Sequence, residues 1–217
     1  VKTTLLSVSG TGTVALNAGL AGAANFAAAN TTGAITLADN FDITGAVDSS
    51  AANQGILNVL GTSTIGGAVG ATNALRAVNA GATGEVATFS AAVKATTLTV
   101  TGTGEVVLGG GLTGAAKFGG DGVITLADTF GITGAVTTTV NNTGTLSFLG
   151  ASTVPGNVGT AALRLKGIDA GVTGKTVTFG GAVFVTGSTL HVTGDGTVVL
   201  SGGLTGKSPV FPPASPE

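Results

Sequence analysis

Short runs of alternating apolar and polar residues follow one another along the chain, separated by glycine and asparagine. In the run 97–101, Leu98 and Val100 alternate with three threonines, and Leu146 and Phe148 alternate with polar residues in the same way. A period of two places successive side chains on opposite faces of a β-strand. We therefore predict many short strands, each with its apolar residues facing inward.

The runs belong to a long internal repeat. The segment Leu6–Gly12 is matched by Leu98–Gly104 and again by Leu190–Gly196, and each step is 92 residues. Strand-like runs recur roughly every 20 to 25 residues, which gives about four runs per repeat. Stacked coils of this length are typical of solenoids. The sequence predicts an all-β fold, a right-handed parallel β-helix (β-solenoid) with about four coils of 20–25 residues per 92-residue repeat.

The repeat also predicts the domain organisation. We expect one continuous solenoid over residues 1–206, made of a first repeat (1–92), a second repeat (93–184) and a partial third (185–206). Residues 207–217 hold four of the five prolines, and proline cannot donate to a strand ladder. That segment is predicted to be a Pro-rich tail or cap. Val1 falls within the repeat pattern, so we expect further repeats upstream.

Charge is scarce and cysteine is absent. Charged residues make up 8% of the chain and the net charge is −2, so no basic surface for nucleic acid or anionic lipid is expected. Glycine, asparagine and threonine interrupt every apolar stretch before the roughly 18 residues of a membrane helix, so direct membrane insertion by this segment is not expected. The absence of cysteine excludes disulfides, thiol catalysis and cysteine metal sites.

Glycine and aspartate recur at the predicted corners between strands. Asp39 and Asp128 occupy an Ala-Asp turn in each repeat and are interpreted as structural, as in an Asx-type turn. Glycine suits corners that need a positive φ or have no room for a Cβ. The turn glycines that recur from repeat to repeat are Gly10, Gly12, Gly102, Gly104, Gly194 and Gly196.

Carboxylates offer little basis for catalysis or metal binding. Cleavage of a glycoside needs two carboxyl groups a few ångströms apart, and Asp39 and Asp42 form the closest pair within a coil. The second repeat has Asp128 and Gly131 at these positions. The segment Gly119–Gly122 resembles glycine- and aspartate-rich calcium repeats, but it occurs once. We predict no catalytic residue, no metal and no cofactor.

The single histidine does not complete a catalytic set. His191 takes the place of Thr99 one repeat earlier, at a position that the alternation turns outward. Asp195, four residues on, falls in the following turn, so a Ser-His-Asp arrangement is not expected. The chain is therefore predicted not to be an enzyme, with a polysaccharide-acting β-helix enzyme as a remote alternative.

Three segments of the repeat are similar, in order and spacing, to the passenger regions of rickettsial outer-membrane autotransporter adhesins. They are Val123–Asp128 leading into Ile132–Val136, then Gly144–Val154, then Ala170–Phe179. The resemblance covers residues 1 to about 206, although this chain is richer in alanine and poorer in asparagine. It implies a secreted β-solenoid on the surface of a Gram-negative cell, attached to the outer membrane in the parent chain, acting in adhesion or surface coating and carrying no catalytic residues.

Two functions fit these observations. The first is a non-enzymatic extracellular rod, structural or adhesive, that meets a host or neighbouring cell surface. The second is a self-assembling subunit of a filament or surface layer, because end coils expose unpaired backbone edges that another copy or a neighbouring repeat can extend.

Overall fold

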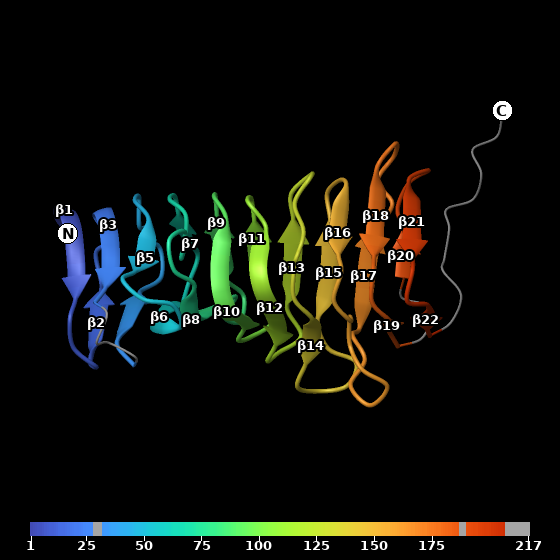
Figure 1. Ribbon diagram of the computed structural model, residues 1–217, viewed down its shortest axis with the longest axis horizontal. Coiled ribbons are helices and arrows are strands. Elements are labelled where there is room, and N and C mark those ends of the chain that lie inside the picture. Colours follow the sequence, from blue (N-terminus) through green and yellow to red (C-terminus); the bar gives the residue numbers. More distant parts are fainter. Residues whose placement is uncertain (28–31, 187–189, 207–217) are drawn as a thin grey trace.

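A computed structural model describes residues 1–27, 32–186 and 190–206. Within them the chain is all-β and contains no helix, and every pair of named strands is parallel. The strands stack as a β-solenoid of about nine turns, which forms a rod (Figure 1). The predicted fold class is therefore confirmed. The predicted tail, 207–217, lies outside the described residues.

Each turn of the chain passes three faces in a fixed order. The first face contains β1 (Lys2–Val8), β3 (Ala21–Phe26), β5 (Val47–Ser49), β16 (Ser152–Val154), β18 (Thr176–Phe179) and β21 (Thr197–Leu200). The second face contains β2 (Thr13–Leu16), β4 (Ala34–Leu37), β6 (Gln54–Val59), β8 (Leu75–Ala80), β10 (Val93–Val100), β12 (Leu112–Phe118), β14 (Val136–Thr138), β19 (Val183–Phe184) and β22 (Leu204–Thr205). The third face contains β7 (Ser63–Ile65), β9 (Val86–Phe89), β11 (Glu105–Leu108), β13 (Val123–Leu126), β15 (Thr145–Phe148), β17 (Gly167–Ala170) and β20 (Leu190–Val192).

Isolated bridges join the sheets of one face. On the first face, Val69 bridges to Val47 and to Val93, the first residue of β10, and Leu112, the first residue of β12, bridges to Ile132. β10 and β12 thus begin on the first face and continue onto the second, with a register shift after Lys94. The Ile132 amide then donates to the Thr153 carbonyl at 3.3 Å, which connects this column to β16. Each face is therefore one continuous column of paired backbone along the rod.

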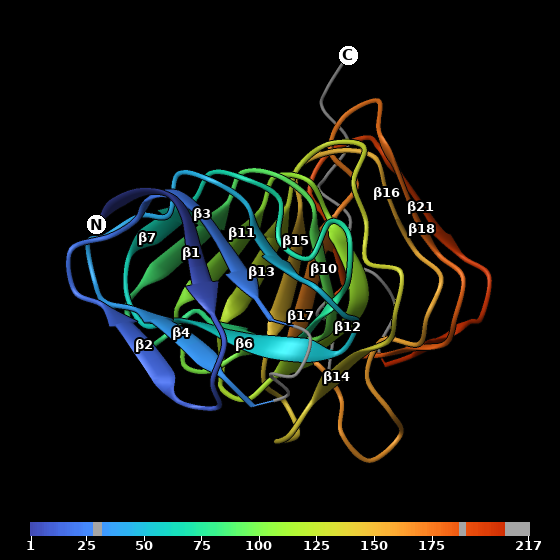
Figure 2. The same cartoon turned by 60° about the vertical axis from the view of Figure 1, so that its left-hand side comes forward.

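The coils differ in the number of residues they contain because the corners between their strands differ in length. The register gives 18 residues from Leu98 to Ala116 and 25 from Ser152 to Val177, so the shortest coils fall below the predicted 20–25. The corner between β14 and β15 is longer than the one between β12 and β13. Figure 2 shows β16, β18 and β21 standing out beyond the earlier coils. Corners absorb these length changes because they carry no ladder.

Alternate residues of each strand build one continuous core. Leu98, Val100 and Leu146 are fully buried and Phe148 is almost so, while their polar neighbours face outward, which confirms the alternation. Each such side chain stabilises the fold by about 1.5–3 kcal/mol through its removal from water. The Phe148 ring meets that of Phe179 edge to face, with centroids 5.6 Å apart.

Two phenylalanines in the core depend on a glycine in the next coil. Phe26 lies beneath Gly55, and Phe118 lies beneath its equivalent, Gly144. Both glycines have a positive φ, 72° and 84°, and a Cβ at either would overlap the ring below. The same ring and glycine pair thus recurs in both repeats, and glycine is required there for two separate reasons.

Candidate functional site

The recurrent turn glycines lie at the outer corners, where successive coils stack. At the predicted glycines of the second and third repeats, an added Cβ would lie within 3 Å of the coil beneath, while φ is not positive. Close stacking of corners is therefore what demands glycine there. In the first described coil, an added Cβ would meet nothing closer than 4.0 Å. The glycines with a contact within 3 Å are Gly102, Gly104, Gly194 and Gly196, and those without one are Gly10 and Gly12.

The two recurrent aspartates tie one coil to the next. Asp39 follows β4, and its Oδ1 accepts a hydrogen bond of 2.9 Å from the Thr62 amide. Asp128 follows β13, and its Oδ1 accepts one of 2.7 Å from the Ala151 amide. In both repeats the donor lies 23 residues further on, one coil higher. These aspartates therefore contribute to stacking as well as to the turn.

In the second repeat, lysines reach across two coils to the aspartates. Lys175 Nζ lies 2.5 Å from Asp128 Oδ2, and Lys166 Nζ lies 2.6 Å from Asp121 Oδ2. Asp121 Oδ1 also accepts from the Gly144 amide at 3.2 Å, in the coil between. Neither pair was predicted from the sequence. Their signal is an Asp and a Lys 45 or 47 residues apart, which is two coil lengths.

These contacts lower the pKa of both aspartates. The hydrogen bond from Lys175, followed by the one from the Ala151 amide, holds the pKa of Asp128 below its ordinary value. Partial burial raises the pKa of Asp121, but the Lys166 bond and charge and the Gly144 amide outweigh it, so the net change is downward. Hydrogen bonds to a carboxylate favour its charged form.

The first repeat has a different arrangement at the same corner. Glu85 stands where Lys175 stands one repeat later, and its Oε2 accepts from the Thr62 amide at 3.0 Å and from the Thr62 hydroxyl at 2.7 Å. Asp42 Oδ1 accepts from the Thr64 amide at 2.7 Å. The acid pair singled out in the sequence, Asp39 and Asp42, thus has each carboxylate bound to an amide of the next coil.

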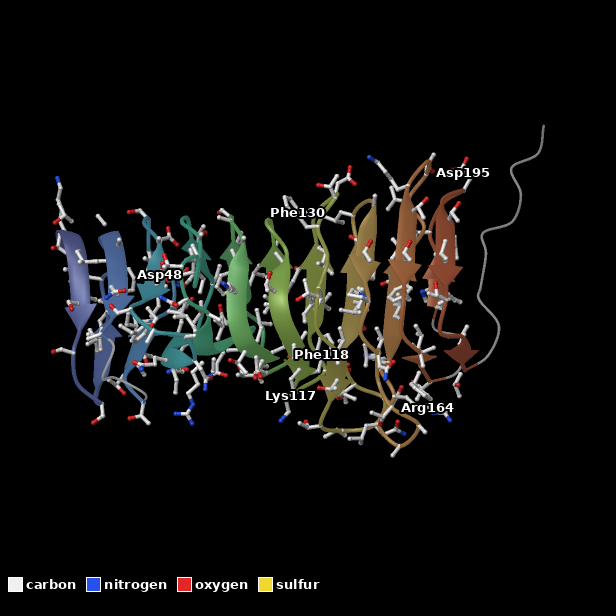
Figure 3. The ribbon with its side chains drawn as sticks, in the orientation of Figure 1. Asp48, Lys117, Phe118, Phe130, Arg164 and Asp195 are labelled. Carbon is white, nitrogen blue, oxygen red and sulfur yellow. The ribbon has the colours of Figure 1, made fainter. Side chains whose placement is uncertain are left out.

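Asp48 forms a further acidic contact in the first repeat. It lies in β5 (Figure 3) and accepts from the amides of Ser49, Thr72 and Asn73 at 2.8, 3.0 and 3.3 Å. Partial burial raises the pKa of Asp48, but these bonds, together with one from the Thr72 side chain, lower it by more. The carboxylate therefore links β5 to the corner of the next coil.

His191 has an aspartate partner, Asp169, which lies one coil away. Its Nδ1 lies 2.9 Å from Asp169 Oδ1 on the neighbouring coil, and about half of the histidine side chain is exposed. Ser147 is next in the same outward column. The serine is therefore two coils, about 10 Å, from the imidazole, which is too far for a general base to act on it. The 22-residue spacing of one coil is the signal that could have found this pair.

An open hollow lies beside an exposed aromatic ring. It has a volume of about 650 Å³ and is lined by Gly111, Thr113, Phe130, Thr133 and Thr153, among others. Phe130 is 40% exposed and lies at the upper rim of the rod in Figure 3. A smaller hollow of about 260 Å³ occurs in the first repeat. Its lining residues are Asn40, Asp42, Thr62, Ser63, Thr64, Val86 and Thr88.

Among the residues that the structure describes, no three or more His, Asp or Glu side chains are placed to hold a metal ion. None of the described segments is a helix long and apolar enough to cross a bilayer.

Comparison with known proteins gives one similarity. No family model and no solved structure matches the chain. Outer membrane protein A of Rickettsia rickettsii is 34% identical to it over 179 residues, which are 80% of this chain and 7% of that protein. The chain thus spans less than a tenth of that relative's length. Together with the β-solenoid, this similarity fits a repeat segment of a surface protein.

Proposed function

We propose that the chain is part of a non-enzymatic, extracellular rod on a bacterial surface, a stalk or adhesive segment of the autotransporter passenger kind. The observation that carries this proposal is the continuity of the rod. All three faces run as paired backbone from end to end, over one unbroken apolar core. With strands about 4.8 Å apart, nine turns span roughly 43 Å.

Contacts that skip a coil add to this continuity. Thr96 Oγ1 donates to Asn53 Oδ1 at 3.1 Å, and one repeat later Thr186 Oγ1 donates to Asn142 Oδ1 at 2.5 Å. Both bonds span two coils, as the two lysine–aspartate pairs do. Each coil is thus linked to the adjacent coil and, at these positions, also to the coil beyond it. Such links suit the transmission of force along the rod.

The extracellular location is proposed from the similarity to a protein named outer membrane protein A. A sparsely charged surface also suits an external medium, because most of its contacts depend little on salt. Charged residues are 8% of this chain, against about 25% in an average soluble domain.

Electron microscopy of the purified chain at several concentrations tests the proposal. We expect single short rods of constant length at every concentration, and we expect beads coated with the chain to be held on cells more strongly than uncoated beads if the segment is adhesive. A stalk that only spaces other domains gives the same rods without bead binding. Filaments or sheets that grow with concentration would instead support the self-assembling subunit.

A further inference from the structure

The sequence repeat does not contain a whole number of turns. Leu6, in β1, lies on the first face, whereas its equivalent Leu98, in β10, lies on the second. From Leu6 to Leu98 the chain takes thirteen steps from face to face, or four turns and one third. The elements visited in order are β1, β2, Leu20, β3, β4, Ile43, β5, β6, β7, Val69, β8, β9 and the two halves of β10.

The same shift holds for equivalent strands throughout the two repeats. β3 and β5 lie on the first face, and their equivalents β12 and β14 lie on the second. β4 and β6 lie on the second face, and their equivalents β13 and β15 lie on the third. β7 and β9 lie on the third face, and their equivalents β16 and β18 lie on the first. Every move is one face forward.

The two hollows follow this rule. Thr62, Thr64 and Thr88 line the smaller one, and their equivalents Ala151, Thr153 and Thr178 line the larger. The smaller hollow lies over β7 and β9, on the third face, and the larger extends over β16 and β18, on the first. One surface feature of the repeat thus appears on two different sides of the rod.

We infer that the repeat presents its outward surface as a screw, turned by a third of a turn at each repeat. Equivalent surfaces point the same way only after three repeats, which are thirteen turns or roughly 62 Å. A flat partner lying along one side of the rod meets a given repeat surface once in three repeats. This inference rests on the register alone and holds whether or not the proposed function does.

Paired spin labels test the shift directly, because the chain has no cysteine of its own. Thr64 and Ser147 lie in one column of the third face, four coils apart. Thr153, six residues after Ser147, is the repeat equivalent of Thr64 and lies on the first face. We compare T64C/S147C with T64C/T153C by pulsed electron paramagnetic resonance.

The same-face pair should give a backbone separation of about 19 Å, and the repeat-equivalent pair a distance longer by on the order of 10 Å, because it also crosses to another face. Equal distances, or a shorter one for T64C/T153C, would overturn the inference. Circular dichroism checks that both variants fold. If either does not, T88C/D169C and T88C/T178C repeat the comparison with the same expected order.

Discussion

The corner after β4 in the first repeat and the corner after β13 in the second share a backbone arrangement but differ in charge. Asp39 and Asp128 each accept a hydrogen bond from the next coil. Two coils higher, the first corner has Glu85 and the second has Lys175. The hydrogen bond from the next coil to the aspartate is present in both repeats. The charge of the side chain two coils away is negative in the first repeat and positive in the second.

The interiors of the two repeats differ much less than their corners. Phe26 and Phe118 are both fully buried, and each lies beneath a glycine of positive φ. Interiors are closely packed, so a change of shape there must be matched by its neighbours. An exposed corner has solvent on one side and tolerates a change of charge. The comparison therefore separates the frame of the rod from the surface that it displays.

Truncation of the buried rings should give the largest effect and affect both repeats alike. We expect F26A and F118A each to lower the free energy of unfolding by about 3–5 kcal/mol, since each leaves a cavity in the core. Urea unfolding followed by circular dichroism measures this. A loss in one repeat several times that in the other would contradict the equivalence of the two interiors.

Filling the space above the Phe118 ring should be nearly as costly. We expect G144A to lose about 3 kcal/mol, because the added methyl both overlaps the ring and requires a positive φ. Gly84 has a φ of 80° with open space around it, so G84A is the matched control and should lose about 1 kcal/mol.

A double variant isolates the contact with the ring. In the F118L background, G144A should cost less than it does alone, because neighbouring substitutions are not additive. Equal costs in the two backgrounds would mean that backbone strain, and not the ring, accounts for the effect.

The frame could be predicted from the sequence more fully than the charged corners. The alternation at Leu98 and Val100 identified the buried side, and the long repeat identified a stack of coils. The third-of-a-turn shift could not be predicted, because coil lengths from 18 to 25 residues are set by corner packing. Pairs such as Lys175 with Asp128 become visible only once the coil length is known.

Thr129 shows a second limit of sequence analysis. Its φ is 73°, and its amide donates to the Ala151 carbonyl at 2.8 Å. At the equivalent position the first repeat has Asn40, with a φ of 60°. Asparagine often adopts this left-handed conformation, but a β-branched residue rarely does. The neighbouring coil holds Thr129 in a conformation that its own side chain does not favour.

Acid should weaken the first repeat through Asp48, whose equivalent in the second repeat is Thr137. Its folded pKa lies below the ordinary value of 3.8, so its contribution is complete above about pH 5 and is lost as the pH falls through 4 toward the folded value. We expect D48N to lose about 1 kcal/mol at pH 7 and to show a shallower fall between pH 5 and 2. Urea titrations across this range measure both. An unchanged acid slope would contradict the assigned role.

Exchanging the charges of the two corners should give the smallest effect, and an opposite sign in each repeat. E85K places a cation two coils above Asp39, as in the second repeat. The variant loses the bonds from Thr62 to Glu85, but the Thr62 amide keeps its bond to Asp39, so we expect a slight net stabilisation. K175E places a second carboxylate above Asp128 and should destabilise it. Both corners are exposed, so both effects should shrink when salt is raised to ~0.5 M. K117Q, at an exposed lysine outside the two pairs, is the control. Shifts of the same sign in E85K and K175E would mean that the backbone bond at each aspartate, and not the more distant charge, sets the stability of these corners.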